Sequence, residues 1–448
     1  MINANYTLVI GLGDTGFSCV RYLSKKGIPL IVMDSREAPA NLEKFRQLYP
    51  DIPIYLGKNW PQEILNHAQC IVLSPGISRA LKPLSIAEEQ GVPILGDIEL
   101  FARENKVPII AITGSNGKST VTTLVGEMAR ASGKTVAIVG NIGSPVLDIL
   151  TEDAHYDLIV MELSSFQLET TTTLRPLAST VLNISPDHLD RYSTLADYIK
   201  AKHRIYLNTQ NAIINKQDQH SLSSEIPDLA IKTFFTLKVP QAGEFGLRQR
   251  EGKWVLAWGE ENLLTSDELK IAGLHNLANA LAALALGSAG GLNLAAMLST
   301  LKNFRGLPHR CQWVRVENGV TWINDSKGTN IGATQAALEG IGAQTTGKII
   351  LILGGEGKGA DFTLLNSVVS QFCRAVILIG KDGPLIGAAL ENTTSLFAAN
   401  NMQTAVNKAQ AIAKTGDIVL LSPACASFDQ YQNYAHRGED FVASVKGL

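Results

Sequence analysis

An apolar, β-type run ends abruptly in the turn Gly-Ser-Asn-Gly-Lys-Ser-Thr, which spans residues 114–120, and a helical pattern follows. The glycines permit a tight turn whose backbone N–H groups can face phosphate oxygens, and the N-terminus of the helix adds positive charge. Lys118 would reach the β- and γ-phosphates of a nucleoside triphosphate, and the hydroxyl of Ser119 or Thr120 would join a Mg²⁺ shell. The loop is short, because Ile112 occupies the position of the usual first glycine. We predict a nucleotide site here; the alternative is a glycine turn with a solvated lysine.

A carboxylate and an imidazole follow two further β-type runs and could complete this site with a metal ion. Glu162 ends a run of Leu, Ile, Val and Met, where an ionised carboxylate is unfavourable unless a cation or hydrogen-bond donors meet it. Because open parallel sheets bind ligands outside the carboxyl ends of their strands, Asn141, Gln167 and His188 are expected at the same edge. We favour a Mg²⁺ ligand for Glu162 over a helix cap or a salt-bridge partner. His188 remains open between a metal ligand and a hydrogen-bonded surface residue.

A second glycine-rich turn, Gly-Leu-Gly-Asp-Thr-Gly at residues 11–16, follows the first β-type run of the chain. Together with Asp34 after the next run, it fits a dinucleotide-binding turn, which alone would suggest NAD. The chain already has a separate triphosphate loop, however, and no obvious set of residues for hydride transfer. The same turn can hold another pyrophosphate, such as that of a UDP-sugar.

Three α/β units must position these residues. The β-type runs of the first unit lie at 7–10, 29–33, 70–73 and 92–95. Those of the second lie at 108–113, 136–139, 158–163 and 180–184, and shorter pieces at 212–214 and 254–258 suggest an antiparallel flank. The third unit has runs at 320–323, 348–353, 375–379 and 417–421. Because strand and helix patterns alternate, we predict parallel sheets in units at 1–97, 98–306 and 307–448.

Composition sets limits on the partners and the compartment. The chain has 448 residues, and 39 basic against 41 acidic side chains give a net charge of −2, which argues against binding to nucleic acid or to an anionic membrane surface. The five cysteines form no CxxC pair, so reduced thiols are expected. No basic segment precedes the first apolar run, and no apolar run approaches spanning length. We expect a cytoplasmic protein without a membrane anchor.

Seven motifs together resemble the Mur ligases, the bacterial ATP-dependent enzymes that add amino acids to the UDP-muramoyl peptide precursor of peptidoglycan. These motifs are Thr113–Thr120, Glu162–Glu169, Asp187–Arg191, Ala201–Arg204, Gly273–Asn279, Gly306–Arg310 and Asn324–Lys327. The resemblance runs from about residue 6 to the C-terminus. Gly96–Phe101 and Ser422–Gln430 resemble the branch of the family that adds D-glutamate. The Asp-Asn-Pro-Arg signature of the branch that adds diaminopimelate or lysine is not found in the C-terminal unit.

The resemblance implies a fold and an activity. The fold has a Rossmann-like N-terminal domain, a central P-loop ATPase-like parallel sheet with an antiparallel flank, and a Rossmann-like C-terminal α/β domain. The activity is ATP-dependent addition of D-glutamate to UDP-N-acetylmuramoyl-L-alanine through an acyl phosphate, in peptidoglycan synthesis and thus in cell division and cell shape. Positioning and electrostatics carry such phosphoryl transfer, so no nucleophilic Ser or Cys is needed. The implied partners are these three small molecules, with the enzyme acting as a monomer.

The resemblance also assigns residues. ATP is expected at Gly114, Ser115, Asn116, Gly117, Lys118, Ser119, Thr120, Asn276, Asn279, Arg310, Asp325 and Lys327. The UDP-substrate is expected at Asp14, Thr15, Ser35, Arg36, Ser74, Gly76, Asn141, Ser164, Gln167 and His188. D-Glutamate is expected at Thr329, Lys358, Ser427 and Phe428. Two Mg²⁺ ions are expected on Ser119, Glu162, His188 and a carbamylated Lys202, and the residues that carry the chemistry are Lys118, Glu162, His188, Lys202 and Lys327.

Two of these assignments have plain alternatives in the residues themselves. Lys202 stands beside His203 and Arg204 and by sequence alone would belong to an exposed basic face, so its role rests wholly on the resemblance. Lys358 follows a glycine-rich turn after a strand pattern, which suits a cation presented to a carboxylate, but a solvated turn lysine has the same sequence. Because the ATP and amino acid sites belong to different units, we also expect the C-terminal unit to rotate from an open to a closed position.

Three other functions stay open. Folylpolyglutamate synthase joins glutamate by an acyl phosphate too, but it would not need a UDP-binding N-terminal unit. An ATP-driven conformational switch would hydrolyse ATP without both organic substrates. An NAD dehydrogenase would show fluorescence of the reduced nicotinamide on binding.

Overall fold

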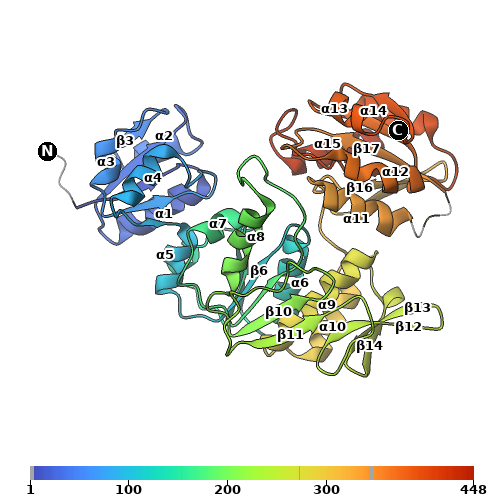
Figure 1. The fold of residues 1–448 in the computed structure, drawn as a ribbon, viewed down its shortest axis with the longest axis horizontal. Helices are drawn as coiled ribbons and strands as arrows, with labels where there is room; N and C mark the ends of the chain where they lie inside the picture. The colour runs from blue at the N-terminus through green and yellow to red at the C-terminus, as the bar shows by residue number, and fades with distance from the viewer. Residues whose placement is uncertain (1–4, 153, 272, 343–344, 346) are drawn as a thin grey trace.

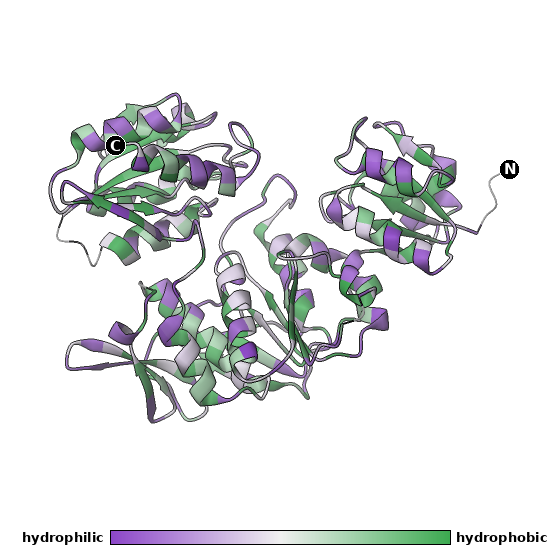
Figure 2. Cartoon of the chain, turned by 180° about the vertical axis from the view of Figure 1, so that it is seen from behind, coloured by the Kyte–Doolittle hydropathy of each residue, from purple (hydrophilic) through white to green (hydrophobic). Residues whose placement is uncertain are grey.

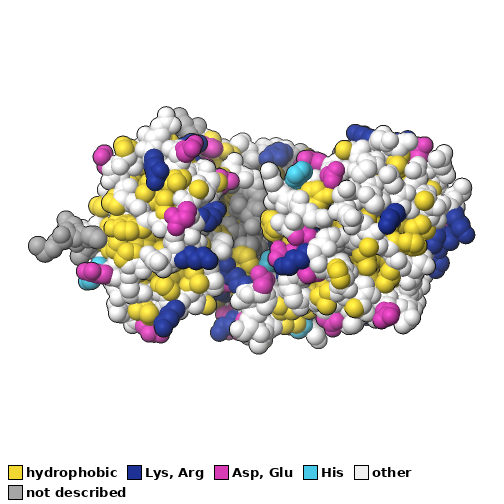
Figure 3. Space-filling model, turned by 90° about the horizontal axis from the view of Figure 1, so that it is seen from above, with side chains coloured by type: hydrophobic (Ala, Val, Ile, Leu, Met, Phe, Trp, Pro, Cys, Tyr) yellow, Lys and Arg dark blue, Asp and Glu magenta, His cyan; other side chains and the backbone are white. Residues whose placement is uncertain are grey.

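The computed structural model describes residues 5–152, 154–271, 273–342, 345 and 347–448. Three separate sheets divide it into an N-terminal, a central and a C-terminal lobe, and the two outer lobes flank the central one (Figure 1). In each lobe, hydrophobic strands lie inside and the hydrophilic residues face outward on helices and loops (Figure 2). Seen from above, a hollow separates the two outer lobes, with charged side chains along its edges (Figure 3). The predicted fold class, three α/β units in series, is confirmed.

The N-terminal lobe is a five-stranded parallel sheet in the order β3-β2-β1-β4-β5. Its strands are β1 (Thr7–Ile10), β2 (Leu30–Asp34), β3 (Ile54–Leu56), β4 (Cys70–Leu73) and β5 (Ile94–Leu95), and its helices are α1 (Asp14–Lys25), α2 (Leu42–Leu48), α3 (Gln62–Asn66) and α4 (Lys82–Glu89). The strand order reverses at β1 and β4, where ligands of such sheets bind. Gly11 has φ +98° there, and a Cβ on it would lie 2.7 Å from the Ser74 side chain, so the close approach of the two strand ends requires glycine.

The central lobe is a nine-stranded sheet in the order β14-β13-β12-β11-β10-β9-β6-β8-β7. Its strands are β6 (Ile109–Thr113), β7 (Val136–Gly140), β8 (Leu158–Glu162), β9 (Ala178–Val181), β10 (Asn211–Asn215), β11 (Ile231–Phe235), β12 (Phe245–Arg250), β13 (Lys253–Trp258) and β14 (Glu261–Thr265). Its helices are α5 (Asp97–Glu104), α6 (Lys118–Ala131), α7 (Ser165–Glu169), α8 (Leu195–His203), α9 (Leu274–Ala289) and α10 (Leu294–Asn303).

The antiparallel flank is confirmed for β12 to β14 but is wrong for 212–214. This segment is β10, which pairs parallel to β9, because α8 carries the chain back to the same end of the sheet.

The C-terminal lobe is a six-stranded sheet in the order β15-β16-β20-β17-β18-β19. Its strands are β15 (Gln312–Glu317), β16 (Val320–Asn324), β17 (Ile349–Gly354), β18 (Cys373–Ile379), β19 (Ser395–Ala398) and β20 (Ile418–Leu421), and its helices are α11 (Ile331–Gly342), α12 (Asn366–Phe372), α13 (Gly383–Ala389), α14 (Met402–Ile412) and α15 (Tyr434–Lys446). The sequence did not predict β15, which forms an antiparallel hairpin with β16. Its turn is Asn318-Gly319, both at positive φ, a dipeptide that is itself a strong hairpin signal.

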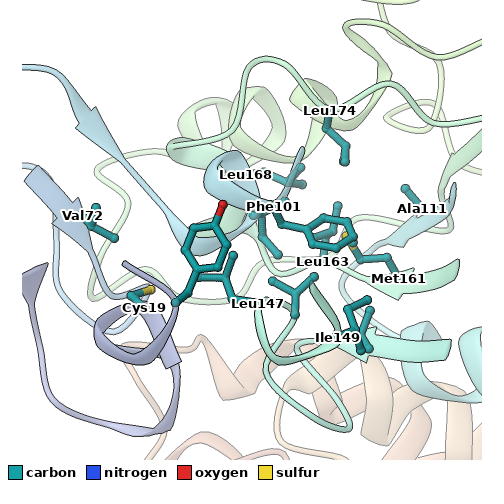
Figure 4. Packing of buried hydrophobic residues seen from close by; sticks show 14 of the residues in the cluster. Cys19, Val72, Phe101, Ala111, Leu147, Ile149, Met161, Leu163, Leu168 and Leu174 are labelled. Atoms are coloured by element: carbon teal, nitrogen blue, oxygen red, sulfur yellow. The ribbon is translucent and has the colours of Figure 1, made fainter. Parts of the chain in front are cut away.

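The lobes are joined in two different ways. One continuous cluster of buried apolar residues runs from the N-terminal lobe into the central lobe. It includes Cys19 of α1 and Val72 of β4 from the first lobe, and Phe101, Leu163 and Leu168 from the central lobe (Figure 4). The two apolar clusters of the C-terminal lobe contain only residues from 311 onward. Within the described part of the chain, the first two lobes therefore share a core, and the third lobe has its own.

The cysteines and the lengths of the helices can be compared with the sequence-based expectations. All five cysteines are free thiols. Among the described residues, no helix combines the length and the apolar character that crossing a membrane would require.

Candidate active site

The predicted phosphate loop lies between β6 and α6, at the carboxyl edge of the central sheet. Gly114 and Gly117 have φ +149° and +84°, so both adopt backbone conformations that favour glycine. A Cβ on Gly117 would lie 2.5 Å from Oδ1 of Asn279, which places this predicted nucleotide residue against the loop. Lys118 curls back over the loop, and its Nζ donates to the carbonyls of Gly114 at 2.8 Å and Ser115 at 3.0 Å. The loop therefore has the tight geometry that phosphate binding requires.

The cavity beside this loop lies between the central and the C-terminal lobes, and residues of both line it. Its walls include eight of the predicted ATP residues: Asn116, Gly117, Thr120, Asn276, Asn279, Arg310, Asp325 and Lys327. Arg310 crosses the junction, and its Nη2 donates to Oγ of Ser119 at 3.0 Å. The remaining predicted residues, Gly114, Ser115, Lys118 and Ser119, form the loop itself. The structure thus brings the predicted ATP residues together from two lobes.

Two charged groups of the C-terminal lobe at this cavity have shifted pKa values. Burial, followed by repulsion from Arg310 and Lys118, lowers the pKa of Lys327 to about 8. Its ammonium lies 3.8 Å from the ring centroid of Tyr434, a cation–π contact. Burial raises the pKa of Asp325 to about 6, although Ser422 and the backbone N–H of Cys311 both donate to its carboxylate.

Glu162 is the last residue of β8 and is 1% exposed. Its Oε1 accepts a hydrogen bond from Nδ2 of Asn141 at 2.8 Å, whereas its buried Oε2 has no hydrogen-bond partner among the described residues. Among the described residues, Glu162 caps no helix and forms no ion pair. The structure therefore shows neither alternative to a metal ligand. A buried carboxylate oxygen without a partner fits a cation.

His188 has φ +56° and packs edge-on against the ring of Phe166, with ring centroids 4.8 Å apart. Burial is the main cause that lowers its pKa to about 4, and the positive charge of Lys358 contributes, while Asp187 opposes the shift. The imidazole is therefore neutral near pH 7 and has a lone pair that a metal ion can use.

Lys202 lies in the last turn of α8 and is 1% exposed, contrary to the exposed basic face that its neighbours suggest. Its Nζ donates to the carbonyl of Gly114 at 2.9 Å and lies 4.7 Å from the ring centroid of Tyr198. Burial, then repulsion from Lys118, lowers its pKa well below the usual value. A lowered pKa makes this amine easier to deprotonate, and reaction with CO₂ requires the deprotonated form.

A second pocket lies where the strand order of the first sheet reverses, and residues of the central lobe complete it. Its walls include the predicted residues Asp14, Thr15, Ser35, Arg36, Ser74, Gly76, Asn141 and Gln167. Two predicted residues are not part of its walls. Ser164 caps α7, where its hydroxyl accepts from the backbone N–H of Gln167 at 3.2 Å, and His188 lines a different cavity.

The contacts of Asp34 argue against an NAD site at the N-terminal glycine turn. Its carboxylate accepts from the backbone N–H of Leu12 at 2.6 Å and from three N–H groups of Arg36. Burial raises the pKa of Asp34, but these hydrogen bonds outweigh burial, so the pKa lies below its usual value. The carboxylate that would bind a ribose in a dinucleotide site is already engaged.

A third cavity lies between the central and C-terminal lobes. Thr329 and Lys358, two of the four residues predicted for D-glutamate, line it together with Asp187 and His188. Lys358 Nζ contacts Oδ1 of Asp187 at 2.8 Å, so this ammonium faces the site and is not a solvated turn lysine.

The other two residues predicted for D-glutamate lie outside this cavity. Ser427 is buried and Phe428 is 71% exposed, and their assignment stays a prediction. Their loop is nevertheless next to that of Lys358, because Glu356 and Ala426 pair through two backbone hydrogen bonds of 3.0 and 2.9 Å.

Several side chains of the site were not predicted. Asn183 clamps the phosphate loop, accepting from the backbone N–H of Asn116 at 2.9 Å and donating to its carbonyl at 3.0 Å. Asn330 donates to Asn116 and to Asp187 across the junction of the two lobes. Asn183 lies two residues beyond the end of β9 at Val181, a position that indicates a ligand-binding residue in a parallel sheet. The sequence prediction missed it because the predicted strand, 180–184, included Asn183.

Three family profiles match successive parts of the chain. They describe a Mur ligase MurD-like N-terminal domain at residues 5–96, a Mur ligase middle domain at 112–287, and a Mur ligase glutamate ligase domain at 309–425.

Relatives of similar length carry the name UDP-N-acetylmuramoylalanine--D-glutamate ligase. One from Legionella pneumophila (strain Paris) is 48% identical over 448 residues, 100% of both chains. One from Pseudomonas fluorescens is 50% identical over 444 residues, 99% of this chain and 98% of the relative. Among solved structures, MurF from Acinetobacter baumannii has a TM-score of 0.63 at 18% identity, covering 100% of this chain and 92% of that one. UDP-N-acetylmuramate-alanine ligase MurC from Thermotoga maritima has a TM-score of 0.59 at 19% identity, with 99% of each chain covered.

Proposed function

The chain belongs to the Mur ligase family, and from that premise we propose that it joins D-glutamate to UDP-N-acetylmuramoyl-L-alanine in an ATP-dependent reaction of peptidoglycan synthesis. The observation that carries the proposal is 48–50% identity, over essentially the full length, to ligases with this activity in their name. The three cavities support it, because one fits each substrate of such a reaction. The N-terminal pocket takes the UDP group, the cavity at residues 114–120 takes ATP, and the cavity at Lys358 takes the amino acid.

The chemistry follows from what the side chains of the chain can do. The L-alanine carboxylate attacks the γ-phosphorus of ATP, forming an acyl phosphate and releasing ADP. The amine of D-glutamate then attacks the acyl carbon, and phosphate leaves with the electron pair of the C–O bond, while the nitrogen releases one proton to the phosphate or to water. Lys118 and Lys327 offset the negative charge on the transferring phosphoryl group, and Lys358 holds a carboxylate of D-glutamate. Rotation of the C-terminal domain over the phosphate loop would exclude water, which would otherwise hydrolyse the acyl phosphate.

Mur ligases use ATP with Mg²⁺, and the residues of this chain fit the metal. We propose that the unpartnered Oε2 of Glu162, the imidazole of His188, the hydroxyl of Ser119 and a carbamate on Lys202 would between them hold two Mg²⁺ ions. Bound there, Mg²⁺ would neutralise phosphate charge and align the reacting groups.

We extend the proposal to the organisation of the chain. The domains are 1–97 for the UDP-substrate, 98–306 for ATP and 307–448 for the amino acid, and the C-terminal domain rotates to close the site. The enzyme acts as a cytoplasmic monomer on these small molecules, without nucleic acid or membrane partners.

The test is phosphate release from ATP with Mg²⁺ and UDP-N-acetylmuramoyl-L-alanine, comparing D-glutamate, L-glutamate and no amino acid. Release that needs both the UDP-substrate and D-glutamate is the expected result. Release that is indifferent to both would favour the ATP-driven switch, and release with a folate in place of the UDP-substrate would favour folylpolyglutamate synthase.

A further inference from the structure

Arg191 lies three residues after His188, and its guanidinium reaches from the central lobe into the N-terminal lobe. Its Nη1 donates to the carbonyl of Pro75 at 2.8 Å, and its Nη2 donates to the carbonyl of Ile77 at 3.3 Å. Both carbonyls belong to residues 74–77, here called the substrate loop, which forms part of the N-terminal pocket. One side chain of the central lobe therefore fixes two backbone groups of the pocket that belongs to the other lobe.

Arg191 is itself held on the side of the central lobe. Its Nη2 also donates to Oε2 of Glu169 at 2.7 Å, and the second oxygen of Glu169 accepts from the hydroxyl of Tyr192. The guanidinium lies 4.0 Å from the ring centroid of Phe166, and this ring packs edge-on against His188. Only 11% of the Arg191 side chain is exposed, so water screens these contacts little. The same guanidinium thus touches the substrate loop and the ring that orients His188.

A second arginine crosses the same junction and provides a comparison. Arg21, on α1, donates to both carboxylate oxygens of Asp148 in the central lobe, at 2.5 and 2.6 Å. Its other described contact is with the ring of Phe17, on its own helix. Arg21 therefore bridges the two lobes without touching the substrate loop or the surroundings of His188.

We propose that Arg191 is a positioning residue, which fixes the substrate loop relative to His188 and so places the substrate carboxylate in line with the γ-phosphate. The inference rests on the proposed function. A planar guanidinium can serve two carbonyls and one carboxylate at the same time, whereas a lysine ammonium lacks this fixed fork. Misplacement of a reacting group by 1 Å costs on the order of 100-fold in rate, so loss of the fork acts mainly on kcat.

The test compares Arg191→Met, Arg191→Lys and the matched control Arg21→Met in the full chain. We would measure kcat and the three substrate KM values by phosphate release, the Tm, and hydrogen exchange of the backbone amides at 74–79. Arg191→Met should lower kcat about 100-fold and raise the KM for the UDP-substrate, with the KM for ATP unchanged within about two-fold. Arg21→Met should leave kcat within about two-fold, although it also removes an ion pair between the lobes.

The other readouts separate positioning from stability. Arg191→Lys should keep the pairing with Glu169 and a Tm near that of the wild type, yet leave kcat at least about ten-fold low. Exchange at 74–79 should become faster in Arg191→Met and stay unchanged in Arg21→Met. Equal losses of kcat in Arg191→Met and Arg21→Met, full activity of Arg191→Lys, or unchanged exchange in Arg191→Met would each overturn the inference. Wild-type protein that releases phosphate without the UDP-substrate and D-glutamate would refute the proposed function instead, and the exchange comparison would still decide whether Arg191 holds the loop.

Discussion

The two junctions between the lobes are built from opposite materials. The first contains a continuous apolar core, in which Asp97 is 3% exposed and burial raises its pKa to about 6. The second is polar, and there burial also raises the pKa of Asp187, but Lys358, His188 and a hydrogen bond from Asn330 together outweigh burial and hold the pKa below its usual value. The same functional group thus shifts in opposite directions at the two junctions. A dry junction holds two lobes in one arrangement, whereas a junction of ion pairs and hydrogen bonds can exchange its partners for water or substrate.

This difference matches the division of labour in the proposed reaction. The UDP-substrate must meet ATP at a fixed distance, and a shared core between their lobes provides that rigidity. We propose that the amino acid binds at the other junction, where its carboxylate would replace Asp187 as the ion-pair partner of Lys358.

Phe101→Ala should lower the free energy of unfolding by about 3–5 kcal/mol, because Phe101 is fully buried in the shared core. Hydrogen exchange should become faster in both the N-terminal and the central lobe. The control is Phe441→Ala, which removes a fully buried ring in the C-terminal lobe and should speed exchange there alone. Urea unfolding with regional hydrogen exchange makes the measurement; faster exchange confined to one lobe in Phe101→Ala would contradict a shared core.

Asp97→Asn should make the protein more stable than wild type, increasingly so as the pH rises from about 4 to 6. The folded wild type binds this proton more tightly than the unfolded chain, whose carboxyl has its usual pKa of 3.8, so wild-type stability falls through this window and stays reduced above it. The difference should reach at most about 3 kcal/mol above pH 6, since each pKa unit corresponds to about 1.4 kcal/mol. Urea unfolding of both proteins at pH 4, 5, 6 and 8 gives the comparison, and a difference that does not vary with pH would argue against a buried carboxyl at this junction.

Lys358→Met should raise the KM for D-glutamate at least about ten-fold and leave the KM for the UDP-substrate within about two-fold, because Lys358 faces the third cavity. The matched control is Lys381→Met. Lys381 is 65% exposed and pairs at 3.7 Å with Glu356, in the same loop as Lys358. Steady-state phosphate release measures both variants. Equal effects of the two substitutions would mean that the loop, and not the Lys358 charge, matters.

High salt should affect the second junction more than the first, and this is the smallest of the expected effects. In 1 M NaCl, screening weakens the charged contacts of the second junction, so the C-terminal lobe should open and the radius of gyration should rise slightly. The first junction should respond less, because its apolar core remains when salt weakens the Arg21–Asp148 ion pair. An ATP analogue with the UDP-substrate should keep the molecule compact at the same salt concentration. Small-angle scattering profiles that neither salt nor ligands change would count against rotation of the C-terminal lobe.

Much of the site could be predicted because many of its functional residues come directly after a strand in the sequence. The phosphate loop and Glu162 come directly after apolar runs, and a parallel sheet places such residues at one edge whatever the packing around them. The burial of Lys202 could not be read in the same way, because it depends on how α8 packs against the loop at Gly114. The reach of Arg191 to Pro75 spans 116 residues of sequence and two lobes, and no local pattern specifies it.

The shared core also has a consequence for biosynthesis. The apolar cluster that contains Phe17 also contains Leu163 and Leu168, which are synthesised about 70 residues after the last strand of the N-terminal lobe. During translation the nascent N-terminal lobe therefore exposes apolar surface until more than a third of the polypeptide has left the ribosome. Chaperones protect exposed apolar surface at such a stage. The C-terminal lobe, with a core of its own, emerges last and folds without that delay.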